Sequence, residues 1–132
     1  MTTTNTTTPT SPPTLDQVLA GMSASLGGNS VPRMVQLAAQ VMPEMVFRHA
    51  QDSGFAMPKE DGALAEETRT LLLLGIALAT GSHCVENLVN KAKAQGIDDA
   101  EVLETFKIAR FAEATRVFNN TVPLFAKLAG EQ

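Results

Sequence analysis

Apolar residues recur at intervals of three and four along most of this chain, and nowhere do they alternate as in a half-buried strand. This spacing places side chains on one face of an α-helix. The clearest example is near the start of the chain, at Leu15, Val18, Leu19, Met22 and Leu26. The pattern predicts an all-α fold, a helical bundle of about six helices.

Residues 65–80 are predicted to form the most buried of these helices, because the run from Leu71 to Ala79 is apolar almost throughout. A helix that is apolar on all sides is typically surrounded by protein. The preceding residues, 52–63, are rich in Gly, Pro and Asp and predict a loop. Four phenylalanines are also interpreted as core residues: Phe106, Phe111, Phe118 and Phe125.

Several helix ends have explicit signals. Thr14 with Gln17, and Asp98 with Glu101, form capping boxes, in which each side chain accepts a hydrogen bond from a backbone N–H at the helix start. Pro43 lies inside an apolar helical pattern and is expected to kink or divide that helix, because proline lacks the N–H that the helix needs.

Composition restricts the class of protein. Ten Lys and Arg stand against fourteen Asp and Glu, a net charge of −4, whereas nucleic-acid binding requires a basic face. The longest apolar run is about half of the roughly 18–20 residues that cross a bilayer. We therefore expect neither nucleic acid nor membrane as a partner. The first residues lack the basic-then-apolar layout of a signal peptide, so the expected compartment is the cytoplasm.

The chain divides into a tail and one domain. Residues 1–13, rich in Thr, Pro and Ser, have no apolar residue after Met1 and predict a disordered tail. Residues 14–132 predict a single helical domain. This domain has many apolar residues for a small helical chain. We therefore predict a homo-oligomer that buries part of its apolar surface between subunits. Five methionines are interpreted as gap-filling or interface residues: Met22, Met34, Met42, Met45 and Met57.

The stretch from Glu67 to Gly96, ETRTLLLLGIALATGSHCVENLVNKAKAQG, contains an apolar helix, a cysteine-containing turn and a second helix ending in Ala-x-x-x-Gly. A capped helix then starts at Asp98. This order resembles the carboxymuconolactone decarboxylase and alkylhydroperoxidase D-like family, and the resemblance covers roughly residues 30–125. It implies an alkylhydroperoxidase D-like helical domain, assembly into trimers or hexamers, and peroxide chemistry.

The redox motif of that family is Cys-x-x-Cys-x-x-x-His, supported by a glutamate on the preceding helix. Cys84 corresponds to the second cysteine of the motif. The other three positions carry different residues: Gly81 or Ser82 for the first cysteine, Leu88 for the histidine, and Thr70 or Arg69 for the glutamate. A peroxidase with this single cysteine would need an external thiol as its reductant.

Three neighbouring residues are the candidate catalytic groups. The positive end of a helix favours the thiolate of Cys84, although a lone cysteine is also often a small buried hydrophobe. His83 and Glu86 are three residues apart and can share a helix face. They are interpreted as an acid–base pair, as two ligands of a metal site completed by another subunit, or as a solvated helix start. No metal and no cofactor is the expectation we adopt.

Arg69 and Arg110 are the candidate substrate-binding residues, because a guanidinium pairs readily with a carboxylate. Arg110, Glu113 and Arg116 are spaced one helical turn apart and predict an ion-pair ladder. The alternative to substrate binding is therefore ion pairing within this helix or between subunits.

Three functions remain open from the sequence. The first is a divergent thiol-dependent peroxidase or antioxidant protein that uses Cys84, assisted by His83 or Glu86. The second is a decarboxylase-like lyase or isomerase for a small carboxylate, with His83 and Glu86 as acid and base and an arginine as clamp. The third is a non-catalytic oligomeric module for interaction or ligand binding.

Overall fold

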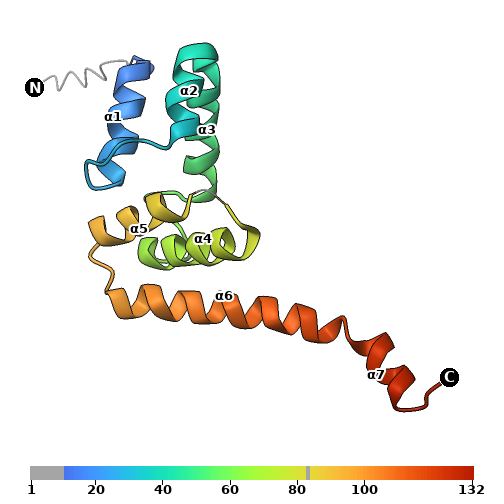
Figure 1. Ribbon diagram of the computed structural model, residues 1–132. Helices are drawn as coiled ribbons and strands as arrows, with labels where there is room; N and C mark the ends of the chain where they lie inside the picture. Colours follow the sequence, from blue (N-terminus) through green and yellow to red (C-terminus); the bar gives the residue numbers. More distant parts are fainter. Residues whose placement is uncertain (1–10, 83) are drawn as a thin grey trace, which may run out of the picture.

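The computed structural model describes residues 11–82 and 84–132, and within them it contains seven α-helices and no strand (Figure 1). The predicted all-α fold is confirmed, but the number of helices is seven rather than about six. Most of the predicted tail, residues 1–10, lies outside the described residues, and residues 11–13 have no regular secondary structure. The helices are α1 (Leu15–Ser25), α2 (Arg33–Val41), α3 (Pro43–Ala56), α4 (Glu66–Thr80), α5 (Val85–Ala94), α6 (Asp99–Asn119) and α7 (Val122–Leu128).

The extra helix results from Pro43. Met42 leaves the helical conformation with φ −153° and ψ 67°, and Pro43 then begins α3, where its missing N–H has no cost. Helix α3 also continues to Ala56, so the predicted loop at residues 52–63 begins later than expected. Asp52 pairs with Arg48 one turn earlier at 3.6 Å, which supports the helical conformation there.

The capping signals are confirmed. At the start of α1 the Gln17 backbone N–H donates to Thr14 Oγ1 at 3.2 Å, and the Thr14 N–H donates to Gln17 Oε1 at 2.9 Å. At the start of α6 the Asp98 N–H donates to Glu101 Oε2 at 3.2 Å. Local sequence therefore fixes where these two helices begin.

The helices form two packed groups. Helix α3 packs against α1 and α2, and α4 packs against α5 and α6. Figure 1 shows α1–α3 side by side, with α4 and α5 between them and the long helix α6. The core of the second group consists of Leu74, Ala77 and Leu88, with Cys84 packed against it. The cysteine thus lies where α4 meets α5.

The carboxyl-terminal half of α6, together with α7, projects away from both groups (Figure 1). We call residues 110–128 the arm. Ala109 is the last buried residue of α6, and α7 buries none. The four phenylalanines predicted to be core residues are exposed in the single chain: Phe106 by 49%, Phe111 by 72%, Phe118 by 71% and Phe125 by 51%. That prediction is wrong for this chain alone, because Phe111, Phe118 and Phe125 lie in the arm, beyond the last buried residue of α6, and Phe106 is half exposed in the part of α6 before it.

Helix α4 is also less enclosed than predicted. It buries Thr70, Leu74 and Ala77 on one side, whereas Leu72 and Ile76 on another side are more than half exposed. The chain exposes 10265 Å², against about 6,700 Å² for a compact monomer of 14.0 kDa. Residues 1–10 would account for about 1,500 Å² even if fully extended. An excess of about 2,000 Å² therefore belongs to the rest of the chain.

Candidate functional site

The turn between α4 and α5 positions Cys84. Gly81 ends α4 in the left-handed conformation at φ 72°, which favours glycine, and the Ser82 N–H returns to the Ala77 carbonyl at 2.9 Å. The backbone N–H of Cys84 donates to Ser82 Oγ at 3.2 Å. Cys84 is the residue immediately before α5, a free and half-buried thiol beside the Leu74–Ala77–Leu88 core.

Glu86 and His83 are the two proposed assistants of Cys84. Glu86 is exposed in the first turn of α5, where a carboxylate interacts favourably with the helix dipole. No hydrogen bond joins its side chain to Cys84 within the described part of the chain. His83 lies outside the described residues, so the predicted acid–base pair has only one member with a defined position.

Two positions of the family's redox motif are part of the structural core. Leu88, at the motif histidine, is 6% exposed and packs against Leu74. Thr70, a candidate for the glutamate position, is 1% exposed and its hydroxyl donates to Gln95 Oε1 at 2.8 Å. Both side chains join α4 to α5, and neither contains a group that titrates near neutral pH.

Arg69 stands one residue before Thr70, and two of its nitrogens are buried without an acceptor. These atoms are Nε and Nη1. The guanidinium lies beneath the loop that precedes α4, so closely that a Cβ atom on Gly62 would collide with Nη1 and approach Cζ to 3.2 Å. A side chain at this position would therefore displace the Arg69 guanidinium.

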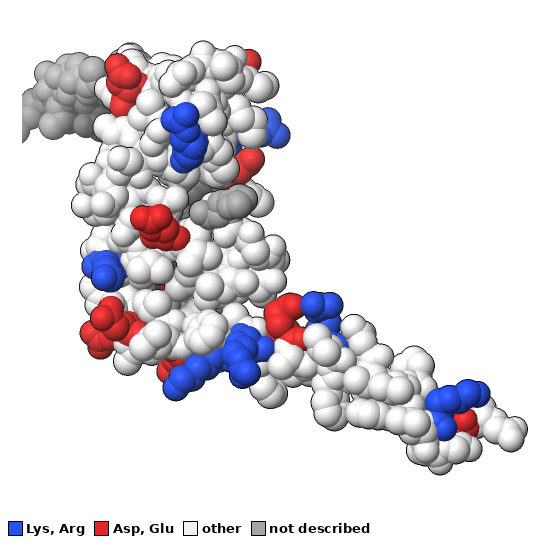
Figure 2. All heavy atoms as spheres, viewed as in Figure 1, with Lys and Arg blue, Asp and Glu red and all other residues white. Residues whose placement is uncertain are grey.

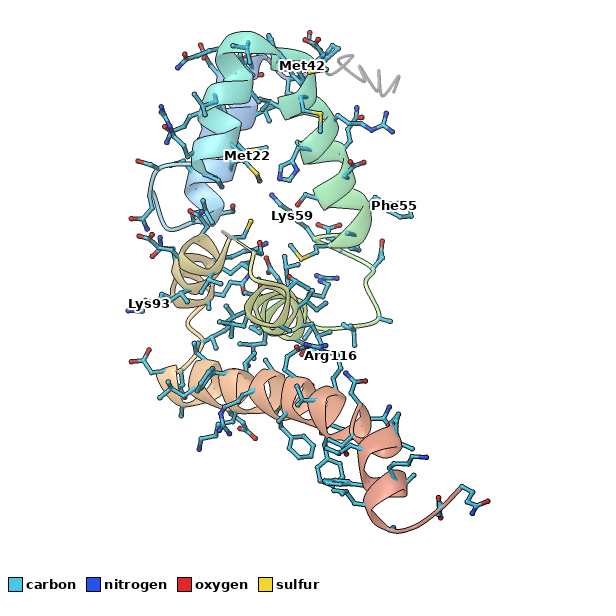
Figure 3. All side chains as sticks on the ribbon, turned by 45° about the vertical axis from the view of Figure 1, so that its right-hand side comes forward. Met22, Met42, Phe55, Lys59, Lys93 and Arg116 are labelled. Atoms are coloured by element: carbon cyan, nitrogen blue, oxygen red, sulfur yellow. The ribbon has the colours of Figure 1, made fainter. Side chains whose placement is uncertain are left out.

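Lys91 feels the charges of Arg69 and Lys59, and neither lysine was a candidate from the sequence. Lys91 is half-buried on α5, and its pKa is lowered by desolvation and by the positive charges of Arg69 and Lys59, against the opposing effect of Glu66. One signal was available: Lys91 stands three residues after the buried Leu88, on the helix side that contains the core. Figure 3 shows Lys59 between the two helix groups and Lys93 pointing away from the protein.

The predicted ladder on α6 is only half formed. Arg116 donates from Nη2 and Nε to Glu113 Oε2 at 2.8 and 3.1 Å, and this hydrogen bond raises the pKa of Arg116. Arg110 is exposed, and among the described residues it forms no ion pair with Glu113. Of the predicted ladder, the structure contains the Glu113–Arg116 pair.

Hollows, metal-ligating residues and apolar helices are the other features of the chain that could indicate a site. An apolar hollow of about 130 Å³ lies between α2 and α3, with the exposed His49 at its edge. In the part of the chain that the structure describes, no three His, Cys, Asp or Glu side chains come close enough to hold a metal ion. No helix in residues 11–82 and 84–132 combines the length and apolar character that crossing a bilayer requires.

The chain was also compared with known protein families and with curated proteins. No protein-family model matches the chain, and no curated protein is significantly similar to it. The function of the chain is therefore inferred from its residues and their geometry.

Proposed function

We propose that this chain is a divergent carboxymuconolactone decarboxylase-like protein, and that it works as a homo-oligomer with thiol-dependent peroxidase activity at Cys84. The observation that carries the proposal is the position of this thiol. Cys84 is free, half-buried and placed at the start of α5, directly after the turn that ends α4. A thiol at such a position lies beside the first backbone N–H groups of α5, which have no acceptor within the helix.

The order of the elements supports the family assignment. Helix α4, the cysteine turn, helix α5 and the capped helix α6 follow one another in the order that the sequence resemblance implies. Helix α5 ends beside Gly96, which has a φ of 75°, and α6 starts with its capping box. Cys84 is the single motif position that retains its redox residue.

The exposed apolar surface supports assembly. A standard interface buries about 800 Å² on each partner, which is less than the excess exposed area of this chain. Ile108, Phe111 and Phe118 follow one another at spacings of three and seven, so they form one exposed stripe along α6. An open hollow of about 380 Å³ lies between α6 and α7, lined by Phe118 and Phe125 among others. Figure 2 shows few charges along most of the arm.

The chemistry would proceed in two stages. The Cys84 thiolate attacks one oxygen of a peroxide ROOH, the S–O bond forms as the O–O bond breaks, and the leaving alkoxide takes a proton to give ROH. Cys84 is then a sulfenic acid. One external thiol displaces water to form a mixed disulfide, and a second releases the Cys84 thiol and leaves as the disulfide of the reductant. The reductant is external because the chain has one cysteine.

A peroxide assay tests this function directly. The oligomer is mixed with hydrogen peroxide or cumene hydroperoxide and dithiothreitol, and the sulfenic acid is trapped with dimedone and located by mass spectrometry. We expect Cys84 to react faster than free cysteine at the same pH, and Cys84→Ser to abolish turnover.

A reaction no faster than that of free cysteine would contradict the peroxidase proposal. Equal turnover by Cys84→Ser would contradict it as well. Glu86→Gln serves as a second variant: a smaller loss of rate with unchanged folding would mean that Glu86 assists the thiol.

A further inference from the structure

The Arg69 guanidinium is a permanent positive charge with five N–H donors. Its Nε and Nη1 are buried without a hydrogen-bond acceptor. Among the described residues no carboxylate forms an ion pair with it. Buried donors almost always have partners, and a charged donor without one is destabilising. The folded chain therefore buries part of the charged Arg69 side chain without a hydrogen-bond acceptor for Nε and Nη1.

Arg69 is accompanied by other cations. Lys91 is half-buried on α5 and Lys59 lies in the loop before α4, and the positive charges of both Arg69 and Lys59 lower the pKa of Lys91. Glu66 is the one acidic group that acts on Lys91 in the opposite direction. Three positive groups and one negative group therefore come together in a chain whose net charge is −4.

The loop before α4 defines how a ligand would approach. The backbone at Gly62 covers Arg69 at Nη1 and leaves no space for a Cβ. Arg69 as a whole is half-buried, and Nη2 is not one of its buried nitrogens without a partner. Nη2 and Nε donate along one edge of the guanidinium, and Nη2 and Nη1 donate along another. An acceptor that binds Nη2 can therefore also accept a hydrogen bond from Nε or Nη1. A group with two oxygens fits such an edge.

We propose that Arg69 and Lys91, together with Lys59, bind the oxyanion group of a small molecule, a carboxylate or a phosphate, at the start of α4 and the end of α5, the opposite ends of these helices from Cys84. The planar Arg69 fork orients the group, and the Lys91 and Lys59 ammoniums supply further charge. The site is separate from the Cys84 thiol, so it stands whether or not the chain is a peroxidase. A metal cation is excluded here by the three positive charges.

Calorimetric titration of the full chain tests this site, with inorganic phosphate and succinate as separate probes and sodium chloride at matched ionic strength as the control. We expect saturable binding of at least one probe. Phosphate alone identifies a phosphate group as the ligand, and succinate alone identifies a carboxylate. Arg69→Met should weaken binding at least about tenfold, because it removes the charged donors.

Two further variants make the result specific. Lys91→Met should also weaken binding, whereas Lys93→Met, on the same helix but pointing away from the site (Figure 3), should bind like wild type. Gly62→Ala should weaken binding by displacing the guanidinium. Circular dichroism checks that each variant is folded, and Cys84→Ser should bind like wild type.

Three outcomes would overturn the proposal. The first is no saturable binding of either probe beyond the effect of chloride. The second is equal binding by wild type and by Arg69→Met. The third is a change in oligomer mass in Arg69→Met without a change in anion affinity, which would mean that a second copy of the chain supplies the missing acceptor.

Discussion

Helix α6 passes through two regions with different surroundings. Its first half packs on α4, where Val102 contacts the core around Leu74 and Ala109 is 9% exposed. In the arm, Phe111 and Phe118 are 72% and 71% exposed. Their nearest aromatic contact is within the arm itself, between Phe118 and Phe125, with ring centroids 6.3 Å apart.

This difference shows which part of the apolar surface the single chain uses for its own stability. In the α4–α5–α6 region, Leu74, Ala77 and Leu88 are buried in one core, so substitutions at these residues act on folding. The arm keeps large aromatic residues in contact with water, which a monomer rarely does over a continuous patch. Substitutions in the arm should therefore act on association with other copies.

The largest effect is expected from Leu74→Ala. The side chain is 1% exposed in the core, so its truncation should lower the free energy of unfolding by about 2–5 kcal/mol. Urea unfolding measures the change. Leu128→Ala makes the same chemical change at a side chain that is 76% exposed, and below the association concentration it should cost less than about 0.5 kcal/mol. Equal costs would remove the contrast between the two regions.

The second effect concerns the hydrogen bond between α4 and α5. Thr70→Val removes the hydroxyl that donates to Gln95 Oε1 at 2.8 Å and should cost about 1 kcal/mol in urea unfolding. Thr80→Val is the matched control, because Thr80 bonds only to the Ile76 carbonyl of its own helix, at 2.8 Å. A larger loss for the control would contradict a role of Thr70 in joining the helices.

A smaller, pH-dependent effect is expected at Lys91. Its folded-state pKa lies below the ordinary 10.5, so the folded protein binds the Lys91 proton less tightly than the unfolded chain does. The charged lysine therefore opposes folding at neutral pH, and this penalty fades as the pH rises through the folded-state pKa towards 10.5. Without anions, Lys91→Met should be more stable than wild type at pH 7, with a difference that shrinks as the pH rises towards 10.5.

Thermal unfolding across this pH range measures the Lys91 effect. Lys93→Met controls for the loss of a positive charge near the carboxyl end of α5. A wild type that is more stable than Lys91→Met at pH 7 would show that Lys91 already has a favourable partner in the folded chain.

The smallest effect is expected from Glu113→Gln. This change breaks the ion pair with Arg116 on the exposed arm, where water and salt screen the interaction. The unfolding midpoint should not change beyond experimental error. A clear loss of stability that depends on protein concentration would place the pair at a subunit interface.

Local signals in the sequence predicted much of the fold. The capping residues Thr14 and Asp98, and the break at Gly81, act within one helical turn, so the sequence alone is sufficient to place them. The effect of Pro43 was open between a kink and a division, and the structure shows a division. The exposure of Phe111 could not be predicted from periodicity, which identifies an apolar helix face but not what covers it.

The candidate site was less predictable for the same reason. Arg69 was selected as a guanidinium, but its missing acceptor depends on the loop at Gly62 and on Lys91, which lies 22 residues later in the sequence. The sequence suggested Arg69 and Arg110 as the substrate-binding residues, whereas in the structure the charge of Arg69 acts on Lys91. The interpretation of Cys84 depends on its position before α5, which the sequence did indicate.

The central claim is that other copies of the chain cover the arm, and sedimentation velocity tests it most directly. Wild type should sediment as a multiple of 14.0 kDa, and Phe111→Ser with Phe118→Ser should sediment as a folded monomer. Phe55→Ser, at a phenylalanine that is 91% exposed on α3 and points away from the protein (Figure 3), should keep the wild-type mass. A monomeric wild type at micromolar concentration, or an unchanged mass in the double variant, would contradict the account.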